Sequence, residues 1–148
     1  MTQAEKDRAD ILAVQKRWMD SAVGLKIDEM RHCFVQGQHL VMWNLNGHAY
    51  FGVDELTQLW RHLQTVYDLT LCQGDSEPSV TVLGDVALVT WERMLMDTNP
   101  KDGSPGSHRR FRGTEVYRRD DGAGNRRWTI WHCHYSDRAP EGARRPGF

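Results

Sequence analysis

The segment near the end of the chain concentrates side chains that could do chemistry. His132 and His134 are two residues apart, so in a β-strand both would project from one face, as two metal ligands can. A zinc site needs three or four ligands, and the spacing supplies no third. Cys133 between them is more typical of a small buried residue than of a nucleophile. We therefore expect neither a metal nor another cofactor.

A carboxylate and a guanidinium on the two preceding segments form a second candidate. If the loop after residues 86–96 centres near residue 104, Arg93 lies opposite Glu115. If the next turn centres near residue 123, Glu115 lies opposite Trp131. Because opposite residues share a face, one face would carry Trp91, Arg93, Glu115, Tyr117, Trp131, Cys133 and Tyr135. A one-residue bulge would exchange the two faces.

Such a face could transfer a proton. Burial would raise the pKa of Glu115 and an adjacent Arg93 would lower it, which suits a general base or acid. Glu115 would move the proton on a small, flat, carbonyl-bearing substrate, while Arg93 and Tyr135 would stabilise an oxyanion. Aromatic rings would stack on the substrate, namely Trp43, Tyr50, Trp60, Trp91, Tyr117 and Trp131. The alternative is an internal ion pair within an ordinary aromatic core.

The elements that must position these residues divide the chain into helical and strand-forming parts. Thr2 and Glu5 have capping-box spacing, and an apolar stripe that includes Gln15 follows them. We expect further helices over residues 27–34 and after Asp54, which can act as an N-cap. Strands are predicted over residues 39–45, 48–51, 69–72, 79–83, 86–96, 109–119 and 127–136. Helices followed by an antiparallel meander predict an α+β fold.

Length and composition narrow the class. The chain has 148 residues, of which 39% are hydrophobic, enough for one domain with a real core. We expect that domain over residues 1–137 and a loose tail over 138–148. The net charge is −1, and the arginines of 108–119 alternate with apolar residues, so we expect a subunit contact or a solvated face and no nucleic-acid partner. The absence of a long apolar window and of a signal-like start predicts a cytoplasmic protein without a membrane partner.

Three stretches together resemble the nuclear-transport-factor-2-like, or SnoaL-like, superfamily. They are residues 51–56 (FGVDEL), 83–89 (LGDVALV), and 114–119 (TEVYRR) followed by 128–136 (WTIWHCHYS). The last stretch is most similar to the association (hub) domain of calcium/calmodulin-dependent protein kinase II. The resemblance implies a cone, in which a curved, mainly antiparallel sheet wraps three N-terminal helices and leaves a pocket at its open end. It also implies a homodimer or larger homo-oligomer.

The hub resemblance also implies which face points inward. Residues matching Arg93, Glu115 and Tyr135 line the hub pocket, so their face would be the inner one, and His132 and His134 would point toward a partner sheet. The hub binds small carboxylates through three arginines and a histidine. Here only Arg93 matches, because Glu115, Tyr135 and Leu56 occupy the other positions. The hub's ligand is therefore not carried over.

Two functions remain. The first is a small-molecule-binding protein that acts as a cofactor-independent isomerase, lyase or cyclase by proton transfer. The second is a non-catalytic oligomeric association or ligand-sensing module resembling the kinase hub. Superfamily membership does not choose between them, because function depends on the pocket residues.

Overall fold

Three helices and seven strands make up the part of the chain that the computed structural model describes, residues 1–147. The helices are α1 (Gln3–Ala22), α2 (Ile27–His32) and α3 (Val53–Val66). The strands are β1 (Val41–Trp43), β2 (Ala49–Phe51), β3 (Tyr67–Gly74), β4 (Ser79–Leu83), β5 (Val86–Pro100), β6 (Ser107–Arg119) and β7 (Trp128–Asp137). All strands belong to one sheet, and the α+β prediction is confirmed.

Helix α1 starts as its sequence predicts, and α3 does not. The Thr2 hydroxyl accepts a hydrogen bond from the Glu5 amide, and the Glu5 carboxylate accepts one from the Thr2 amide, which completes the capping box. The predicted Asp54 cap is wrong. Gly52 is the N-cap of α3, at φ 81°, and Asp54 lies inside the first turn. Glu55 instead accepts from the Phe51 amide at 2.6 Å, so a carboxylate still closes this helix start.

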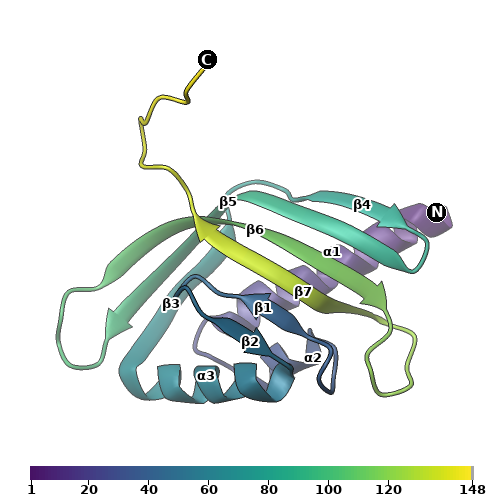
Figure 1. The fold of residues 1–148 in the computed structure, drawn as a ribbon, viewed down its shortest axis with the longest axis horizontal. Coiled ribbons are helices and arrows are strands. Elements are labelled where there is room, and N and C mark those ends of the chain that lie inside the picture. The colour runs from purple at the N-terminus through teal and green to yellow at the C-terminus, as the bar shows by residue number, and fades with distance from the viewer. Residues whose placement is uncertain (148) are drawn as a thin grey trace.

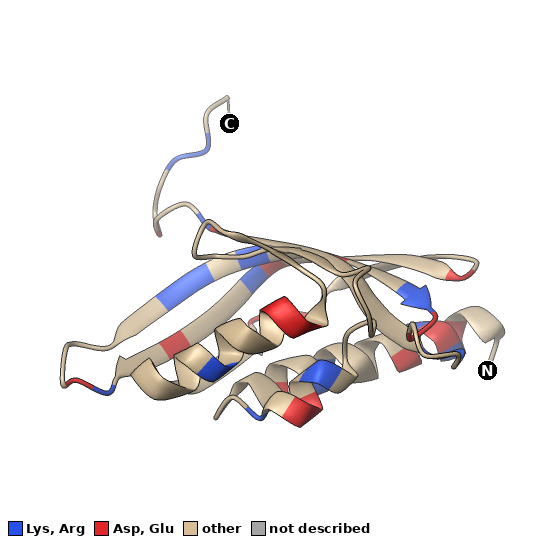
Figure 2. Ribbon diagram, turned by 60° about the horizontal axis from the view of Figure 1, so that its bottom comes forward, with Lys and Arg blue, Asp and Glu red and all other residues tan. Residues whose placement is uncertain are grey.

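The sheet has the order β2-β1-β7-β6-β5-β3, with β4 paired to β5. Strands β5, β6 and β7 form the predicted antiparallel meander, while β1 runs parallel to β7. The long strands curve over the helices, which lie on one side of the sheet (Figures 1 and 2). The concave face of the sheet and the helices therefore enclose the core.

Two bulges in the meander change which side chains point to the inner side of the sheet, so part of the predicted assignment is wrong. Val89 pairs with Glu115 and Trp91 with Gly113, but the next pair is Met94 with Phe111, so β5 carries one extra residue. The extra residue gives the inner face to Met94 and leaves Arg93 exposed. The prediction that Arg93 points inward beside Glu115 is therefore wrong.

The second bulge lies between β6 and β7. Glu115 pairs with Cys133 rather than Trp131, and Tyr117 pairs with Ile130. Cys133 and Ile130 are both completely buried, so Trp131 is the residue displaced to the outer side. There its ring stacks on His39, with the Arg118 guanidinium 4.2 Å from its centroid. The inward assignment of Trp131 is wrong for this reason.

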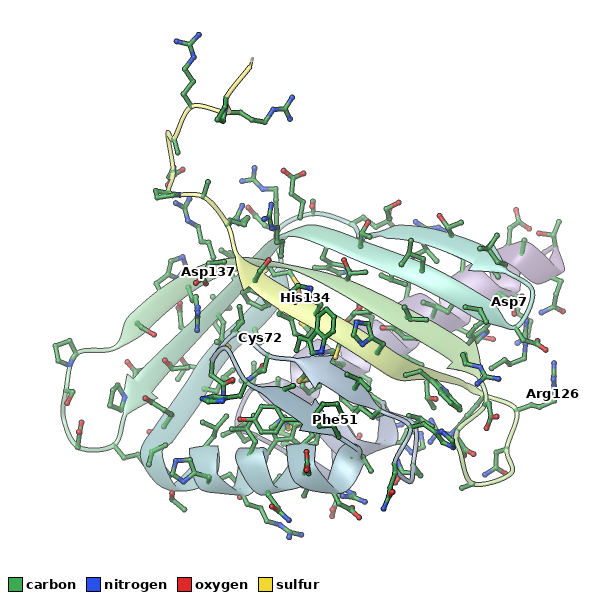
Figure 3. All side chains as sticks on the ribbon, in the orientation of Figure 1. Asp7, Phe51, Cys72, Arg126, His134 and Asp137 are labelled. Carbon is green, nitrogen blue, oxygen red and sulfur yellow. The ribbon has the colours of Figure 1, made fainter. Side chains whose placement is uncertain are left out.

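Charged residues tie the first helix to the far end of the sheet. Figure 2 shows charges on the helices and along the long strands, and Figure 3 shows Asp7 and Arg126 at the same end of the molecule. Arg119 at the end of β6 holds both Asp7 carboxylate oxygens, at 2.6 and 2.9 Å, and also contacts Asp85. These hydrogen bonds from Arg119 lower the pKa of Asp7 to about 2. Within residues 1–147, none of the helices has the length and apolar character needed to span a membrane.

Candidate functional site

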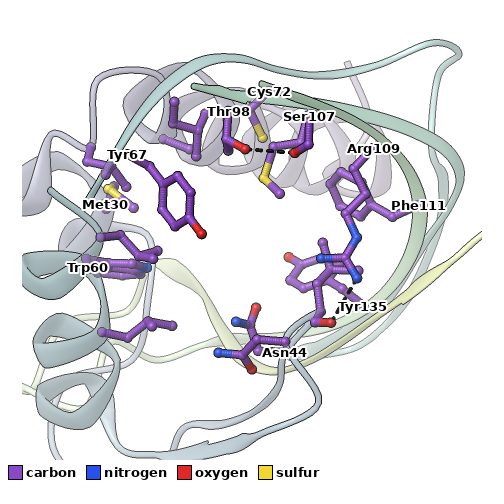
Figure 4. A pocket seen from close by; sticks show the side chains of 18 of the residues that line it. Met30, Asn44, Trp60, Tyr67, Cys72, Thr98, Ser107, Arg109, Phe111 and Tyr135 are labelled. Atoms are coloured by element: carbon purple, nitrogen blue, oxygen red, sulfur yellow. Dashed lines mark hydrogen bonds between the residues drawn. The ribbon is translucent and has the colours of Figure 1, made fainter. Parts of the chain in front are cut away.

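A cavity of about 430 Å³ opens between the helices and the concave face of the sheet (Figure 4). Every helix contributes to its wall, and so do β1, β3, β5, β6 and β7. Much of the wall is soft and apolar, because four methionines and Cys72 line it beside Trp60. The methionines are Met19, Met30, Met42 and Met96. Such flexible thioether side chains adapt to the shape of an apolar ligand.

One part of the wall is polar and belongs to a hydrogen-bonded cluster. Tyr135 and Trp18 both line the cavity, and Trp18 Nε1 donates to the Tyr135 hydroxyl at 3.0 Å. The Tyr135 hydroxyl in turn donates to Glu115 Oε2 at 2.6 Å. This distance lies in the short range of hydrogen bonds from a hydroxyl to a carboxylate. Tyr135 thus joins the cavity to a carboxylate behind its wall.

Glu115 is itself only 1% exposed and does not line the cavity. Its Oε1 accepts hydrogen bonds from Gln15 Nε2 at 2.8 Å and from the Tyr117 hydroxyl at 3.2 Å. All its donors are neutral. Burial therefore raises the pKa of Glu115, and the three hydrogen bonds oppose that shift only in part.

The neighbouring groups are held in their neutral forms. Burial and the nearby Glu115 carboxylate raise the pKa values of Tyr117 and Tyr135 well above the ordinary range. Burial likewise raises the pKa of the Cys133 thiol well above its usual value. Burial therefore favours the neutral form of each of these groups, and Glu115 is the one carboxyl group among them.

Further polar groups line other parts of the cavity wall. The Tyr67 hydroxyl points into the cavity, and the Asn44 amide faces the same space (Figure 4). Arg109 also lines the cavity, but Asp137 neutralises it through contacts of 2.6 and 3.0 Å. The cavity therefore combines an apolar middle with hydrogen-bonding groups on two sides.

The position of the Tyr135 ring depends on a glycine. Gly113 on β6 pairs with Tyr135 on β7. A Cβ atom at Gly113 would lie 2.5 Å from two carbon atoms of that ring, closer than carbon atoms can approach. Gly113 therefore leaves the space that the ring occupies.

The structure brings together only part of the predicted site. Trp60 and Tyr135 line the cavity, and Glu115 and Tyr117 form the cluster behind it. Arg93 lies outside, where it pairs with Asp75 at 3.0 Å.

The remaining predicted aromatic residues do not line this cavity, so their assignment to it is wrong. Trp43 is on the outer side, 50% exposed, with its ring edge-on to His132 and His134, because the alternation of β1 gives the inner face to Met42. Trp91 lies at the β5 bulge, with its ring against Gly74. Tyr50 accepts a hydrogen bond from Asn46 beside the β1–β2 turn.

Two members of the cluster were missing from the predicted site. Gln15 and Trp18 lie on the buried face of α1, three residues apart, and both reach across to the sheet. A signal for Gln15 exists in the sequence, because a buried amide within an apolar stripe needs a hydrogen-bond partner. The partner, Glu115, is 100 residues away and is not identified by local spacing.

Comparisons with known proteins agree with this architecture. The model of the SnoaL-like domain family matches residues 11–140. A nuclear transport factor 2-like superfamily protein from Salmonella enterica serovar Typhimurium superimposes with a TM-score of 0.82 at 17% identity, over 95% of this chain and 96% of that one.

Two further structures have the same fold. A candidate dehydratase of the nuclear transport factor 2-like family from Streptomyces avermitilis has a TM-score of 0.72 at 15% identity, over 93% of this chain and 99% of its own. A ketosteroid isomerase-like protein from Erwinia carotovora atroseptica has a TM-score of 0.70 at 16% identity, over 89% and 96%. No curated protein matches the sequence.

These identities establish a shared fold, and the closer resemblance to the kinase hub stays a prediction. The family match covers most of the chain and includes every strand that builds the cavity. The chain therefore belongs to the SnoaL-like domain family.

Proposed function

We propose that this protein binds a small, largely apolar molecule in the cavity and exchanges a proton with it through Tyr135. The observation that carries the proposal is the 2.6 Å hydrogen bond between Tyr135, in the cavity wall, and the buried Glu115. A ligand in the cavity reaches the Tyr135 side chain, while Glu115 behind it supplies a base whose pKa is raised by burial.

The proposed step conserves atoms and charge. The ligand gives a proton to the Tyr135 oxygen as Tyr135 passes its own proton to Glu115 Oε2. The negative charge then moves from Glu115 to the ligand, and Glu115 becomes a neutral acid. Return of the proton to a different ligand atom would give an isomerisation, and loss of a leaving group before its return would give an elimination.

This chemistry falls in the class of cofactor-independent isomerases, lyases and cyclases. The names of two proteins of this fold, one ketosteroid isomerase-like and one a candidate dehydratase, support that class. It differs from the mechanism expected from sequence in two respects. Tyr135 passes the proton to Glu115 rather than stabilising an oxyanion. Arg93 has no part in the mechanism, and Trp18 supplies a hydrogen bond in the cluster instead.

Hydrogen exchange at carbon tests the proposal. We would incubate the protein with 2-tetralone in D₂O and follow loss of the α-hydrogens by NMR. The wild type should accelerate exchange, and Glu115→Gln should abolish the acceleration because the amide cannot take the proton. The exposed Glu92→Gln, the same chemical change on β5, is the matched control and should behave as wild type. Equal acceleration by wild type and Glu115→Gln would exclude Glu115 as the base.

A second candidate function, oligomeric association, is supported by the outer side of the sheet. Trp43 is 50% exposed and Phe51 on the adjacent strand is 59% exposed. Large aromatic side chains left open to water are typical of contact surfaces. A homodimer through this face should appear in light scattering of the wild type, and Trp43→Asp should convert it to a monomer. A wild-type monomer at all concentrations would contradict this assignment.

A further inference from the structure

The hydrogen bonds around the Tyr135 hydroxyl run in one direction while Glu115 is ionised. The indole Nε1 of Trp18 can only donate, and an ionised carboxylate can only accept. The Tyr135 oxygen therefore accepts from Trp18 at 3.0 Å, and its proton goes to Glu115 at 2.6 Å. One lone pair of the hydroxyl is left over. In this state Tyr135 offers the cavity a hydrogen-bond acceptor.

A proton on Glu115 reverses this arrangement. Oε1 already accepts from Gln15 and Tyr117, so a proton there would displace a donor. Among the hydrogen bonds of Glu115, Oε2 takes part in one, with the Tyr135 hydroxyl. A proton on Oε2 would therefore point at the Tyr135 oxygen. That oxygen would then accept from both Trp18 and Glu115. The Tyr135 proton has to turn away from Glu115, and the cavity side is where Tyr135 has room for it.

We propose that Glu115 sets the hydrogen-bonding polarity of the cavity: its ionised form selects ligands that donate a hydrogen bond, and its protonated form selects ligands that accept one. The inference rests on the proposed function in one respect, namely that the cavity binds a small molecule. It defines the ligand class as apolar molecules with a single carbonyl group and their enol or hydroxyl counterparts. A carbonyl group accepts a hydrogen bond, and its enol or hydroxyl counterpart can donate one. Each member of such a pair therefore matches Tyr135 in one protonation state of Glu115.

Glu115 is the group in this cluster that changes its charge, because its titratable neighbours stay neutral. From the sheet, Tyr117, Tyr135, Cys133 and Cys72 surround it, and burial raises the pKa of each. Cys33, which follows α2, has its pKa raised to about 12 by burial. Helix α1 contributes Gln15 and Trp18, which do not titrate. All five titratable neighbours therefore stay neutral while Glu115 changes its charge.

Three naphthalene derivatives of similar size test the inference by calorimetry. 2-Naphthol donates a hydrogen bond, 2-acetonaphthone only accepts one, and 2-methylnaphthalene does neither. The ratio of the affinity for 2-naphthol to that for 2-acetonaphthone should rise by about tenfold from pH 5 to pH 8, since each ligand gains or loses about one hydrogen bond. The affinity for 2-methylnaphthalene should not change with pH, and this ligand reports whether the cavity binds an apolar molecule at all.

Two variants separate the switch from general effects of pH. In Glu115→Gln the amide donates to Tyr135 as the protonated acid would, so the ratio should keep its low-pH value at every pH. In Tyr135→Phe the hydroxyl is gone, and the ratio should not change with pH. Glu92→Gln should reproduce the wild-type profile.

The possible failures are distinguishable. If 2-methylnaphthalene does not bind the wild type, the cavity is not a ligand site, and both the proposed function and the inference are overturned. If it binds while the wild-type ratio is the same from pH 5 to pH 8, only the inference is overturned. The wild-type measurements need no variant, so they decide the question even if Glu115→Gln misfolds.

Discussion

Tyr135 and Glu115 share a 2.6 Å hydrogen bond, but only Tyr135 lines the cavity. The carboxylate that could accept a proton is therefore separated from a ligand by one hydroxyl. Four residues from α1 and β6 position the pair. Gln15 and Tyr117 hold the far oxygen of Glu115, Trp18 holds the Tyr135 oxygen, and Gly113 leaves room for the ring.

Removal of the Tyr135 hydroxyl should destabilise the fold. Tyr135→Phe leaves Trp18 Nε1 and Glu115 Oε2 buried without the hydrogen bonds they make in the wild type. An unsatisfied buried polar group costs about 1–3 kcal/mol, so we expect a loss in that range in urea unfolding. The control Tyr50→Phe removes a hydroxyl beside an exposed turn and should change stability by less than about 0.5 kcal/mol. Equal losses in the two variants would show that the buried cluster adds nothing to stability.

Glu115 should make the protein less stable as the pH rises above the pKa of an unfolded glutamate, near 4.5. Burial raises its pKa in the folded state, so between the two pKa values the folded protein holds more protons than the unfolded chain. The free energy of unfolding then falls with increasing pH, by at most about 1.4 kcal/mol per pH unit.

Urea unfolding of wild type and Glu115→Gln from pH 4 to pH 8 measures this contribution. The stability of the variant relative to wild type should increase with pH, because only the wild type has to ionise the buried group. Glu92→Gln should show no such trend. Parallel stability curves for wild type and Glu115→Gln would mean that Glu115 has an ordinary pKa in the fold.

The Asp7–Arg119 pair should have the opposite pH dependence. Arg119 lowers the pKa of Asp7 from 3.8 to about 2, so its stabilisation is present above pH 3.8 and disappears as the pH falls toward 2. Asp7→Asn should therefore reduce the free energy of unfolding at pH 7, and the difference from wild type should shrink as the pH approaches 2. Asp10→Asn, on the exposed side of the same helix, should have a much smaller effect. A difference that persists unchanged at pH 2 would assign the loss to something other than charge.

Arg93→Gln distinguishes the sequence-based site from the observed one. A catalytic Arg93 in the pocket would make the variant inactive, whereas the structure places this side chain on the surface with Asp75. We expect naphthalene binding and 2-tetralone exchange to match wild type within about twofold, as for an ordinary surface substitution. A tenfold loss in either assay would contradict the position of Arg93.

Much of the fold can be predicted from the sequence. The capping box, the apolar stripe of the first helix and the succession of strands all follow from short-range patterns, because each depends on neighbouring residues. The meander also follows from the succession of three long strands. Boundaries were less accurate, since β5 continues to Pro100 rather than ending near residue 96.

The site was predictable only where the strands alternate regularly. Glu115 and Tyr135 share a face because β6 and β7 pair without a bulge between residues 111 and 116. Arg93 and Trp131 lie at the two bulges, where one added residue moves each side chain to the outer side. The contribution of α1 was out of reach for a further reason, since helix-to-sheet contacts such as Gln15 with Glu115 join positions that local periodicity does not connect.

Gly113 is a residue whose importance is invisible to any search for functional groups. Having no side chain, it takes part in no chemistry. The Cβ atom of an alanine at this position would nevertheless clash with the Tyr135 ring and displace it. A single methyl group on a neighbouring strand would thus displace the Tyr135 hydroxyl from the proposed site, although the sequence would still contain every residue of the cluster. Homologous chains with a larger residue at this position would have to place their hydroxyl elsewhere, so this glycine is a marker for tracing which relatives share the same chemistry.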